Sequence, residues 1–526
     1  MRWIVMSLLT LAFVARSTHA QDKGGASDAK WKEAMQLYKD DFKKKSIRFK
    51  KRAIEALPPS DARTITFIIE EEKLLSSKDW WIRFTAAEQL SKIRDPGLRA
   101  KLLTYAKNSD VKVREGVITA LAMSNDRLDA PVIIDALKDT AWQVRRMACW
   151  AAGQQRVKEA VEPMIAMINW VDPRSGAEKQ KGEPHSRVHG VLVFNLEEIT
   201  GQTEFGTDVE QWRQYWEVNK DKTLPKVKRF DVGDFGDVKN IQFNDTYARR
   251  GTGPLTIVLP ITHTTTVYYM PYFSQWNFVK WMYVNMPPLS SFPDVQRDDG
   301  DAIYPVDILV EAFEDMRKKR NAEQIVLLAH GFTTWVAAKY AQKYPNRVLG
   351  LILLDPYASD ETFGKAVDSA LRSGDPDAEF WGKVSRREIK IGSALEGEVY
   401  GYCRTSWYLA PKNREDVEIG MLQTVWHDPG GENIVIPQFD IRGEEISRIP
   451  ALIFLPGKEN ELCAFDDLGR LQRYYPKNVI VKGGDKFAYM PFMEAPDMFE
   501  QGLRAFVDKK VLEETPTKGM AGKTGK

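Results

Sequence analysis

The sequence contains little cysteine. Its three cysteines, Cys149, Cys403 and Cys463, are odd in number and lie far apart in a chain of 526 residues. This spacing predicts neither a disulfide framework nor a metal site of closely spaced thiolates. Histidine is also scarce, with six residues, and none of them has an acidic partner at metal-ligand spacing. We therefore expect no metal and no cofactor.

The chain also lacks an excess of charge of either sign. Lysine and arginine number 75 against 73 aspartates and glutamates, so the formal net charge is +2. Residues 1–20 carry Arg2 and Arg16 and no acid, so removal of this segment takes the net charge from +2 to 0. A neutral chain offers no electrostatic basis for binding nucleic acid or anionic membranes. Beyond residue 20, no apolar run is long enough to span a bilayer.

The first twenty residues have the layout of a secretory signal peptide. Arg2 precedes the apolar run WIVMSLLTLAFVA, and Thr18-His19-Ala20 supplies the small residues of a cleavage site. The polar segment QDKGGASDAK follows directly. We predict that the mature chain starts near Gln21, that residues 21–30 form a linker, and that the protein is exported to the periplasm or the extracellular space.

The N-terminal half repeats at a fixed spacing. The segments WWIRFTAAEQL, VKVREGVITAL and WQVRRMACWAA begin at Trp80, Val111 and Trp142, which are 31 residues apart, and a weaker copy begins at Phe49. Each of the three has an arginine at the same place: Arg83, Arg114 and Arg145. Second amphipathic segments separate the copies. A period near 30 with two helices per unit predicts an α-solenoid.

This pattern resembles HEAT-like repeats of the short bacterial type, in which an arginine follows an apolar residue early in the second helix. A polar insertion interrupts the array at 172–185. The sequence Ile-Thr-Gly-Gln before Trp212 and Trp216 resembles the C-terminal cap of such arrays in exported planctomycete-type proteins. The resemblance implies an array over residues 31–222 that binds an unknown protein partner, and the concave face of such arrays is usually a binding surface.

From about residue 226 the pattern changes to alternating strands and helices. Three near-continuous apolar runs, PLTIVLPI, IVLLAH and LGLILLDP, begin at positions 254, 325 and 349. Amphipathic segments such as DILVEAFEDMRKKR and TTWVAAKYAQKY stand between them. This alternation predicts a mostly parallel sheet with helices on both faces. The fold class is therefore multidomain: an all-α solenoid followed by an α/β domain.

The α/β segments resemble the α/β-hydrolase family over residues 226–510. The stretches YPNRVLGLILLDP, after the second of the three strands and its helix, and MPFMEAPDMFEQGLRAFV, near the end, are characteristic of that family. The resemblance implies a helical lid at 358–440. Residues 511–526 are expected to be a disordered tail.

In that family the nucleophile sits in the motif G-x-S-x-G, on a strained turn between strand and helix. The matching pentapeptide here runs from Ala329 to Thr333 and reads AHGFT, so Gly331 stands at the nucleophile position. No serine or cysteine lies between Ile325 and Ala358. This departure from the family pattern holds in any alignment register.

The other two members of the family triad are also replaced. The acid position, in Gly-Lys-Glu-Asn, is taken by Asn460, although Glu459, Glu461 or Asp355 could substitute for it. The base position aligns with Tyr489, and a phenol with a pKa of about 10 is a poor general base at neutral pH. No histidine occurs after His427. The sequence thus predicts the fold of a hydrolase without its catalytic triad.

Two interpretations of this domain remain open. In the first, the domain binds a ligand without catalysis, in a pocket formed by residues near the lost triad: Thr262, His263, Thr264, His330, Gly331, Phe332, Asn460 and Tyr489. In the second, it is an esterase-like hydrolase with an unorthodox site around His263 and His330. The hydroxyls of the threonine-rich loop ITHTTT could bind an anion or a sugar, or could simply cap strand and helix ends. A purely structural role in the cell envelope is a third, weaker alternative.

Overall fold

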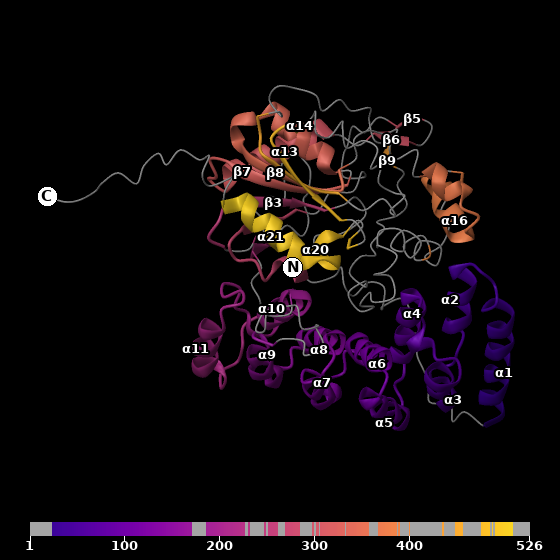
Figure 1. Cartoon of the computed structure of the whole chain (residues 1–526). Coiled ribbons are helices and arrows are strands. Elements are labelled where there is room, and N and C mark those ends of the chain that lie inside the picture. Colours follow the sequence, from indigo (N-terminus) through magenta and orange to yellow (C-terminus); the bar gives the residue numbers. More distant parts are fainter. Residues whose placement is uncertain are drawn as a thin grey trace.

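The computed structural model shows a helical part followed by a part built on a sheet (Figure 1). Residues 1–23, 171–185 and most of 357–447 lie outside the described residues, as does the end of the chain from residue 509. The segments predicted as signal peptide and tail fall in these ranges. The structure describes residues 24–170, 186–226, 230–231, 247–248, 251–260, 269–284, 297–298, 301–303, 306–331, 333–356, 367–386, 388–389, 399, 434–435, 448–455, 475–483, 486–487 and 490–508.

The helical part consists of two rows of helices. An inner row packs in succession: α2 (Ile47–Glu55), α4 (Trp80–Ser91), α6 (Val111–Ser124), α8 (Trp142–Gln155) and α10 (Ser186–Thr200). An outer row lies on the side of the inner row that faces away from the sheet part: α3 (Ala62–Thr66), α5 (Pro96–Thr104), α7 (Ala130–Ala136), α9 (Val161–Met167) and α11 (Val209–Asn219). The first helix, α1 (Gly24–Asp41), packs on α2 and begins inside the segment predicted as a linker. The alanine, lysine and glutamate of DAKWKEAM favour helix there.

The repeated arginines have a common structural role. Each one, near the start of an inner-row helix, donates hydrogen bonds to backbone carbonyl oxygens five or six positions earlier, in the turn before that helix. The bonds run from Arg83 to Ser77 (2.8 Å) and Lys78 (3.1 Å), from Arg114 to Asn108 (2.8 Å) and Ser109 (3.1 Å), and from Arg145 to Asp139. The same side chain thus stabilises the same turn in each repeat, which accounts for the arginine at the 31-residue spacing.

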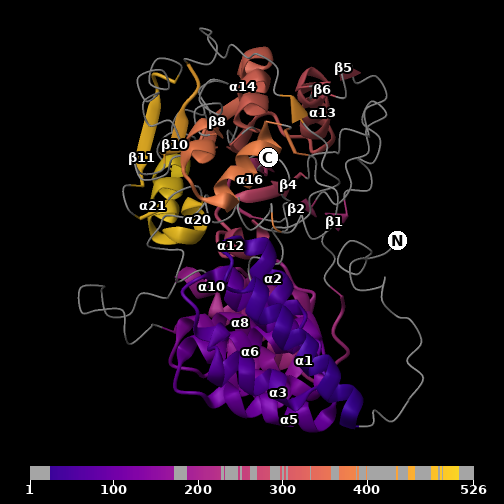
Figure 2. The same ribbon diagram turned by 90° about the vertical axis from the view of Figure 1, so that its right-hand side faces the viewer.

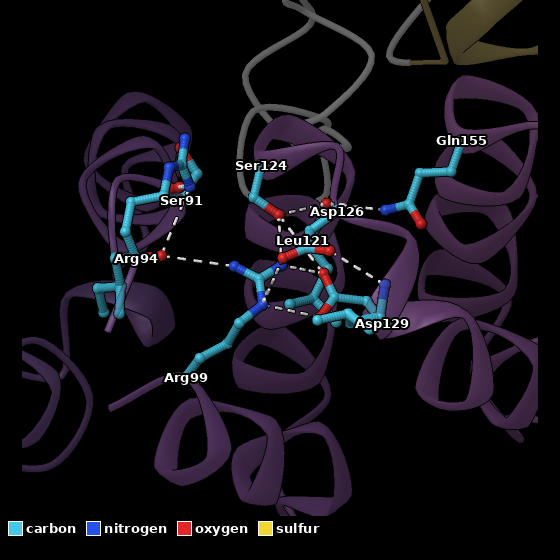
Figure 3. A network of polar contacts seen from close by, with 10 residues as sticks. Ser91, Arg94, Arg99, Leu121, Ser124, Asp126, Asp129 and Gln155 are labelled. Atoms are coloured by element: carbon cyan, nitrogen blue, oxygen red, sulfur yellow. Dashed lines mark hydrogen bonds and ion pairs between the residues drawn. The ribbon is translucent and has the colours of Figure 1, made fainter. Parts of the chain in front are cut away.

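Another buried arginine ties the two rows together. Arg99 of α5 donates to Asp129, which precedes α7, with a distance of 2.9 Å from Nε to Oδ1. It also donates to the Ser124 hydroxyl at the end of α6, at 2.8 Å (Figure 3). Asp129 is fully buried. A buried carboxylate of this kind requires its cationic partner, so this pair fixes the junction of three helices.

The inner row is covered on the side that faces away from the outer row. The helices α4, α6 and α8 are buried along almost their whole length, whereas a helix at a free surface keeps one polar, exposed stripe. The residue that follows each repeated arginine is also buried, at positions 31 residues apart: Phe84, Glu115 and Arg146. The side of the row that faces away from the outer row is therefore not a free surface, and the second part contacts it at α2, α8 and α10.

The second part is built on a mostly parallel sheet of eight strands in the order β1-β2-β4-β3-β7-β8-β10-β11. The parallel strands are β4 (Lys280–Tyr283), β3 (Leu255–Leu259), β7 (Ile325–His330), β8 (Val348–Leu354), β10 (Ala451–Leu455) and β11 (Asn478–Lys482). At one edge, β2 (Tyr247–Ala248) runs antiparallel to β4 and to β1 (Phe230–Asp231). A small separate sheet joins β5 (Arg297–Asp298), β6 (Asp301–Ile303) and β9 (Ile434–Val435).

Helices lie on both faces of the large sheet. The helices α13 (Val306–Lys319) and α14 (Thr333–Lys343) lie on one face, and α20 (Pro491–Glu494) and α21 (Pro496–Phe506) on the other (Figure 1). The strands β7 and β10 are buried at every residue, as parallel strands covered on both faces must be. The prediction of helices followed by a parallel α/β sheet is thus confirmed. Within the described residues, no helix is long and apolar enough to cross a membrane.

Among the described residues, the two parts meet at both ends of the inner row. The short helix α12 (Met270–Phe273) and α21 both pack on α10, and Figure 2 shows α12 directly over the inner row. Arg146 of α8 lies over the ring of Tyr272, 4.9 Å from its centroid. At the other end of the row, Asp377 accepts hydrogen bonds from the hydroxyl of Ser46 (3.0 Å) and the backbone N–H of Ile47 (3.1 Å), at the start of α2. Asp377 belongs to α16 (Pro376–Ser385), which lies between β8 and β10 in the chain.

A buried histidine at this junction makes stability depend on pH. Burial lowers the pKa of His189, on α10, to about 4. The hydrogen bond to the Ile168 carbonyl and the nearby Glu500 and Asp497 of α21 raise this pKa, but they offset the effect of desolvation only in part. The unfolded chain, with a histidine pKa of about 6.5, binds more protons between pH 4 and 6.5. The contribution of His189 to the free energy of unfolding is fully present above pH 6.5. It falls by about 3 kcal/mol as the pH drops to 4.

We expect the variant His189→Gln, which is neutral at every pH, to lose that part of the pH dependence. Urea unfolding of the wild type and the variant between pH 4 and 7.5 measures it. The difference in unfolding free energy between the two proteins should change by about 3 kcal/mol across this range. A difference that stays constant with pH would contradict the assignment.

Candidate functional site

The strand β7 ends in a tight turn that leads directly into α14. Gly331 occupies the turn with φ of +59°, a left-handed backbone conformation that glycine adopts without steric cost. It is buried, and its N–H donates to the carbonyl oxygen of Leu354 at the end of β8, at 2.9 Å. The turn therefore has a left-handed residue between strand and helix, and that residue carries no side chain.

Two threonine hydroxyls hold the turn in place. The Thr333 hydroxyl accepts the N–H of His330 at 2.9 Å and lies 3.0 Å from the carbonyl oxygen of Leu259, to which it donates. The Thr334 hydroxyl donates to the Gly331 carbonyl oxygen at 2.6 Å. Both threonines are buried. Their hydroxyls thus bond to backbone groups of β3 and of the turn, whereas the threonine-rich loop ITHTTT lies outside the described residues.

His330 is packed and hydrogen-bonded. It is fully buried, and its Nδ1 lies 2.7 Å from the hydroxyl of Tyr269. The rings of Tyr269 and Phe492 meet the imidazole edge to face, with centroids 5.9 and 6.3 Å away. The tyrosine–histidine pair therefore links the elbow to the segment that leads into α12.

The structure describes two of the eight predicted pocket residues, His330 and Gly331, and places them side by side at the end of β7. The other six, listed here, lie outside the described residues: Thr262, His263, Thr264, Phe332, Asn460 and Tyr489. Asp355, one of the alternative acids, directly follows β8 and is buried, with φ of +45°. A non-glycine residue in this conformation carries local strain.

Sequence reasoning did not single out Tyr269. It lies in the aromatic stretch VYYMPYF, where no spacing or motif separates the residue that contacts the elbow from those that only pack. The bond to His330 joins residues 61 positions apart. The pairing of β3 with β7 and the packing of α12 on α10 contribute to this approach.

The described residues of the turn have these roles: Gly331 carries no side chain, the hydroxyls of Thr333 and Thr334 bond to backbone groups, and His330 is buried. No group of three or more histidines, cysteines, aspartates or glutamates within the described part of the chain could hold a metal ion. Cys149 is fully buried among helices, and this burial raises the pKa of its thiol.

Comparison with known proteins shows local similarity to α/β-hydrolase-domain proteins. No family model matches the chain. A stretch of 53 residues, 10% of this chain, is 42% identical to the abhydrolase domain-containing protein abhd-5.2 of Caenorhabditis elegans and covers 12% of it. A stretch of 65 residues, 12% of this chain, is 37% identical to the 1-acylglycerol-3-phosphate O-acyltransferase ABHD5 of Sus scrofa and covers 19% of it. The matches thus span less than a fifth of the length of these relatives.

Solved structures of hydrolases also align with about half of the chain. The α/β hydrolase MGS-M2, from a deep-sea metagenome library, is 14% identical, with a TM-score of 0.34, over 52% of this chain and 97% of its own. Proline iminopeptidase of Mycobacterium smegmatis is 13% identical, with a TM-score of 0.36, over 53% and 100%. The sheet described above and the local sequence matches agree with the predicted α/β-hydrolase fold.

We expect Thr333→Val to destabilise the sheet part by about 1–3 kcal/mol, because it leaves the buried N–H of His330 without its acceptor. Thr334→Val is the matched control. It removes a hydroxyl from the next residue, but the Gly331 carbonyl oxygen keeps the N–H of Thr334 at 3.1 Å. Urea unfolding of both variants measures the difference. Equal losses would contradict the role assigned to Thr333.

Proposed function

We propose that this chain is an exported, non-catalytic binding protein, in which a HEAT-like helical array is joined to a hydrolase-like domain without a triad. One observation carries the proposal: a buried glycine at positive φ stands where the elbow would present its nucleophile. A side chain at such a turn stores about 1–3 kcal/mol of strain. A protein that no longer uses the hydroxyl can therefore keep the turn and relax it with glycine.

The sequence supports the loss of the remaining chemistry. The family positions of the acid and the base hold Asn460 and Tyr489, and the chain has no histidine after His427. An asparagine in place of the triad acid lowers the rate of a serine protease by about 10⁴. Three changes at one site are more consistent with a retained fold than with a modified catalyst.

The interpretation of the helical part as a HEAT-like array has its own support. The helices form two rows, and the repeated arginines cap the turns before the inner-row helices at a period of 31 residues. Arrays of this kind usually bind their ligand on the concave face. The inner row contacts the sheet part of the same chain at both ends, so we propose that a protein partner would bind the outer row.

The ligand we propose for the hydrolase-like domain is a small molecule, held at the carboxyl ends of β3, β7 and β8, where open parallel sheets bind ligands. Nucleic acid is not an expected partner, because the predicted mature chain is neutral. A structural role in the cell envelope is a weaker alternative of the same non-catalytic kind.

An enzyme with an unorthodox site around His263 and His330 is the second candidate. The observation in its favour is the hydrogen bond between His330 and Tyr269 next to the elbow, because a bonded partner fixes the orientation of an imidazole. Some proteins that match part of this chain are named 1-acylglycerol-3-phosphate O-acyltransferases. Acyl transfer or ester hydrolysis is therefore the reaction class to test.

We expect the purified protein to hydrolyse no p-nitrophenyl ester from acetate to palmitate above the uncatalysed rate and to resist labelling by a fluorophosphonate probe. The variant Gly331→Ser should also remain inactive, because the acid and base positions are still changed. Turnover or labelling that His330→Ala or His263→Ala abolishes in a folded protein would overturn the proposal in favour of the second candidate.

Export is tested separately. We expect the protein isolated from its native cells to begin near Gln21 and to occur in the periplasmic or secreted fraction, because residues 1–20 have the layout of a cleaved signal peptide. Amino-terminal sequencing after cell fractionation measures both. An intact Met1 in cytoplasmic material would contradict the localisation and would leave the binding proposal unaffected.

A further inference from the structure

We propose that the helical part sets the geometry of the elbow through α12, and that Arg146 and Tyr272 are positioning residues for the Tyr269–His330 hydrogen bond. This inference rests on the proposed function only in treating the elbow as the wall of a ligand pocket. The two parts would then not be independent modules on one chain. The inner row would act as a support that fixes one side of the pocket.

The first step is the contact between Arg146 and α12. Arg146, in the middle of α8, is fully buried, and its guanidinium lies 4.9 Å from the centroid of the Tyr272 ring. A guanidinium over an aromatic face is attracted by the ring, and the attraction is stronger when water is excluded. The neighbouring inner-row helix, α10, packs on α12 as well. The position of α12 is thus defined by two helices of the inner row.

The second step leads from α12 to the elbow. The ring of Tyr272 meets that of Phe492 edge to face, with centroids 5.4 Å apart. The same Phe492 ring lies 5.0 Å from Tyr269 and 6.3 Å from His330. Tyr269 directly precedes α12 and holds Nδ1 of His330 at 2.7 Å. Any shift of α12 therefore moves both the aromatic packing and the hydrogen-bond partner of His330.

The third step is the rigidity of the elbow itself. His330 is anchored on its backbone side, where its N–H bonds to Thr333 and its strand pairs with β3 and β8. The side chain depends on Tyr269, which directly precedes α12, and on Phe492 of α20, both outside that strand. Because packed interiors respond to displacement by discrete rearrangement, loss of the Arg146 contact should loosen the imidazole without melting the sheet.

The test compares two adjacent arginines of α8 in the full-length protein. Arg146→Met keeps an unbranched chain and removes the charge. Arg145→Met is the matched control, because Arg145 bonds to the Asp139 carbonyl and lies 4.4 Å from the Trp170 ring, away from α12. The readout is the rate at which diethyl pyrocarbonate modifies His330, measured by mass spectrometry on the tryptic peptide 321–339, in which it is the sole histidine.

We expect Arg146→Met to raise the modification rate of His330 about tenfold, as loss of a desolvated cation–π contact would. Arg146→Lys should give a smaller rise and Arg145→Met a change of less than about twofold. If Arg146→Met does not fold, Tyr272→Leu removes the other partner and should give the same rise. An unchanged rate in a folded Arg146→Met or Tyr272→Leu variant, or an equal rise in Arg145→Met, overturns the proposal.

This readout separates the inference from the proposed function. Modification of His330 requires no ligand, so an unchanged rate would leave the binding role intact. An esterase activity, on the other hand, would overturn the binding role without altering the expected rates. Circular dichroism melting curves confirm for each variant that the chain is folded when its rate is measured.

Discussion

The burial of the inner row of helices is the constraint on which the rest of the structure depends. The helices α4, α6 and α8 have buried side chains nearly all round, so they need cover on two sides. The outer row covers one side, and the sheet part contacts the other at both ends of the row, through α12 and α21 at α10 and α8 and through α16 at α2. A helical array that stood alone would expose this surface to water, which would be unfavourable. The two parts are therefore best understood as one folding unit.

Polar side chains make this junction specific. The fully buried Arg146 lies against Tyr272, Asp377 caps the start of α2, and His189 is kept neutral near the acids of α21. Each of these groups would be costly to bury in a different arrangement. Burial of apolar side chains drives the association of the two parts, and these polar groups favour one relative arrangement of them. The same junction ends at α12, one residue after the tyrosine that bonds to His330.

Much of the fold could be predicted from the sequence, because its local patterns follow directly from geometry. The 31-residue period marks the inner-row helices, and the runs TIVLP, IVLLAH and LGLILL mark three adjacent strands of the sheet. The glycine at 331 was also visible, since the strand–turn–helix pattern around it identifies the elbow. The start of α1 at Gly24, inside the expected linker, was missed because the segment has no apolar period to mark it.

The sequence by itself determined the order of helices and strands, the position of the elbow and the absence of a nucleophile there. These depend on residue types within one element, where the period of 3.6 or 2 relates a side chain to its neighbours. Only the tertiary structure decided that the inner row contacts the sheet part at both of its ends, and that Tyr269 reaches His330. Those contacts join residues of different elements, such as Arg146 and Tyr272 or Ser46 and Asp377. Their partners are selected by the packing of whole elements, which no local pattern encodes.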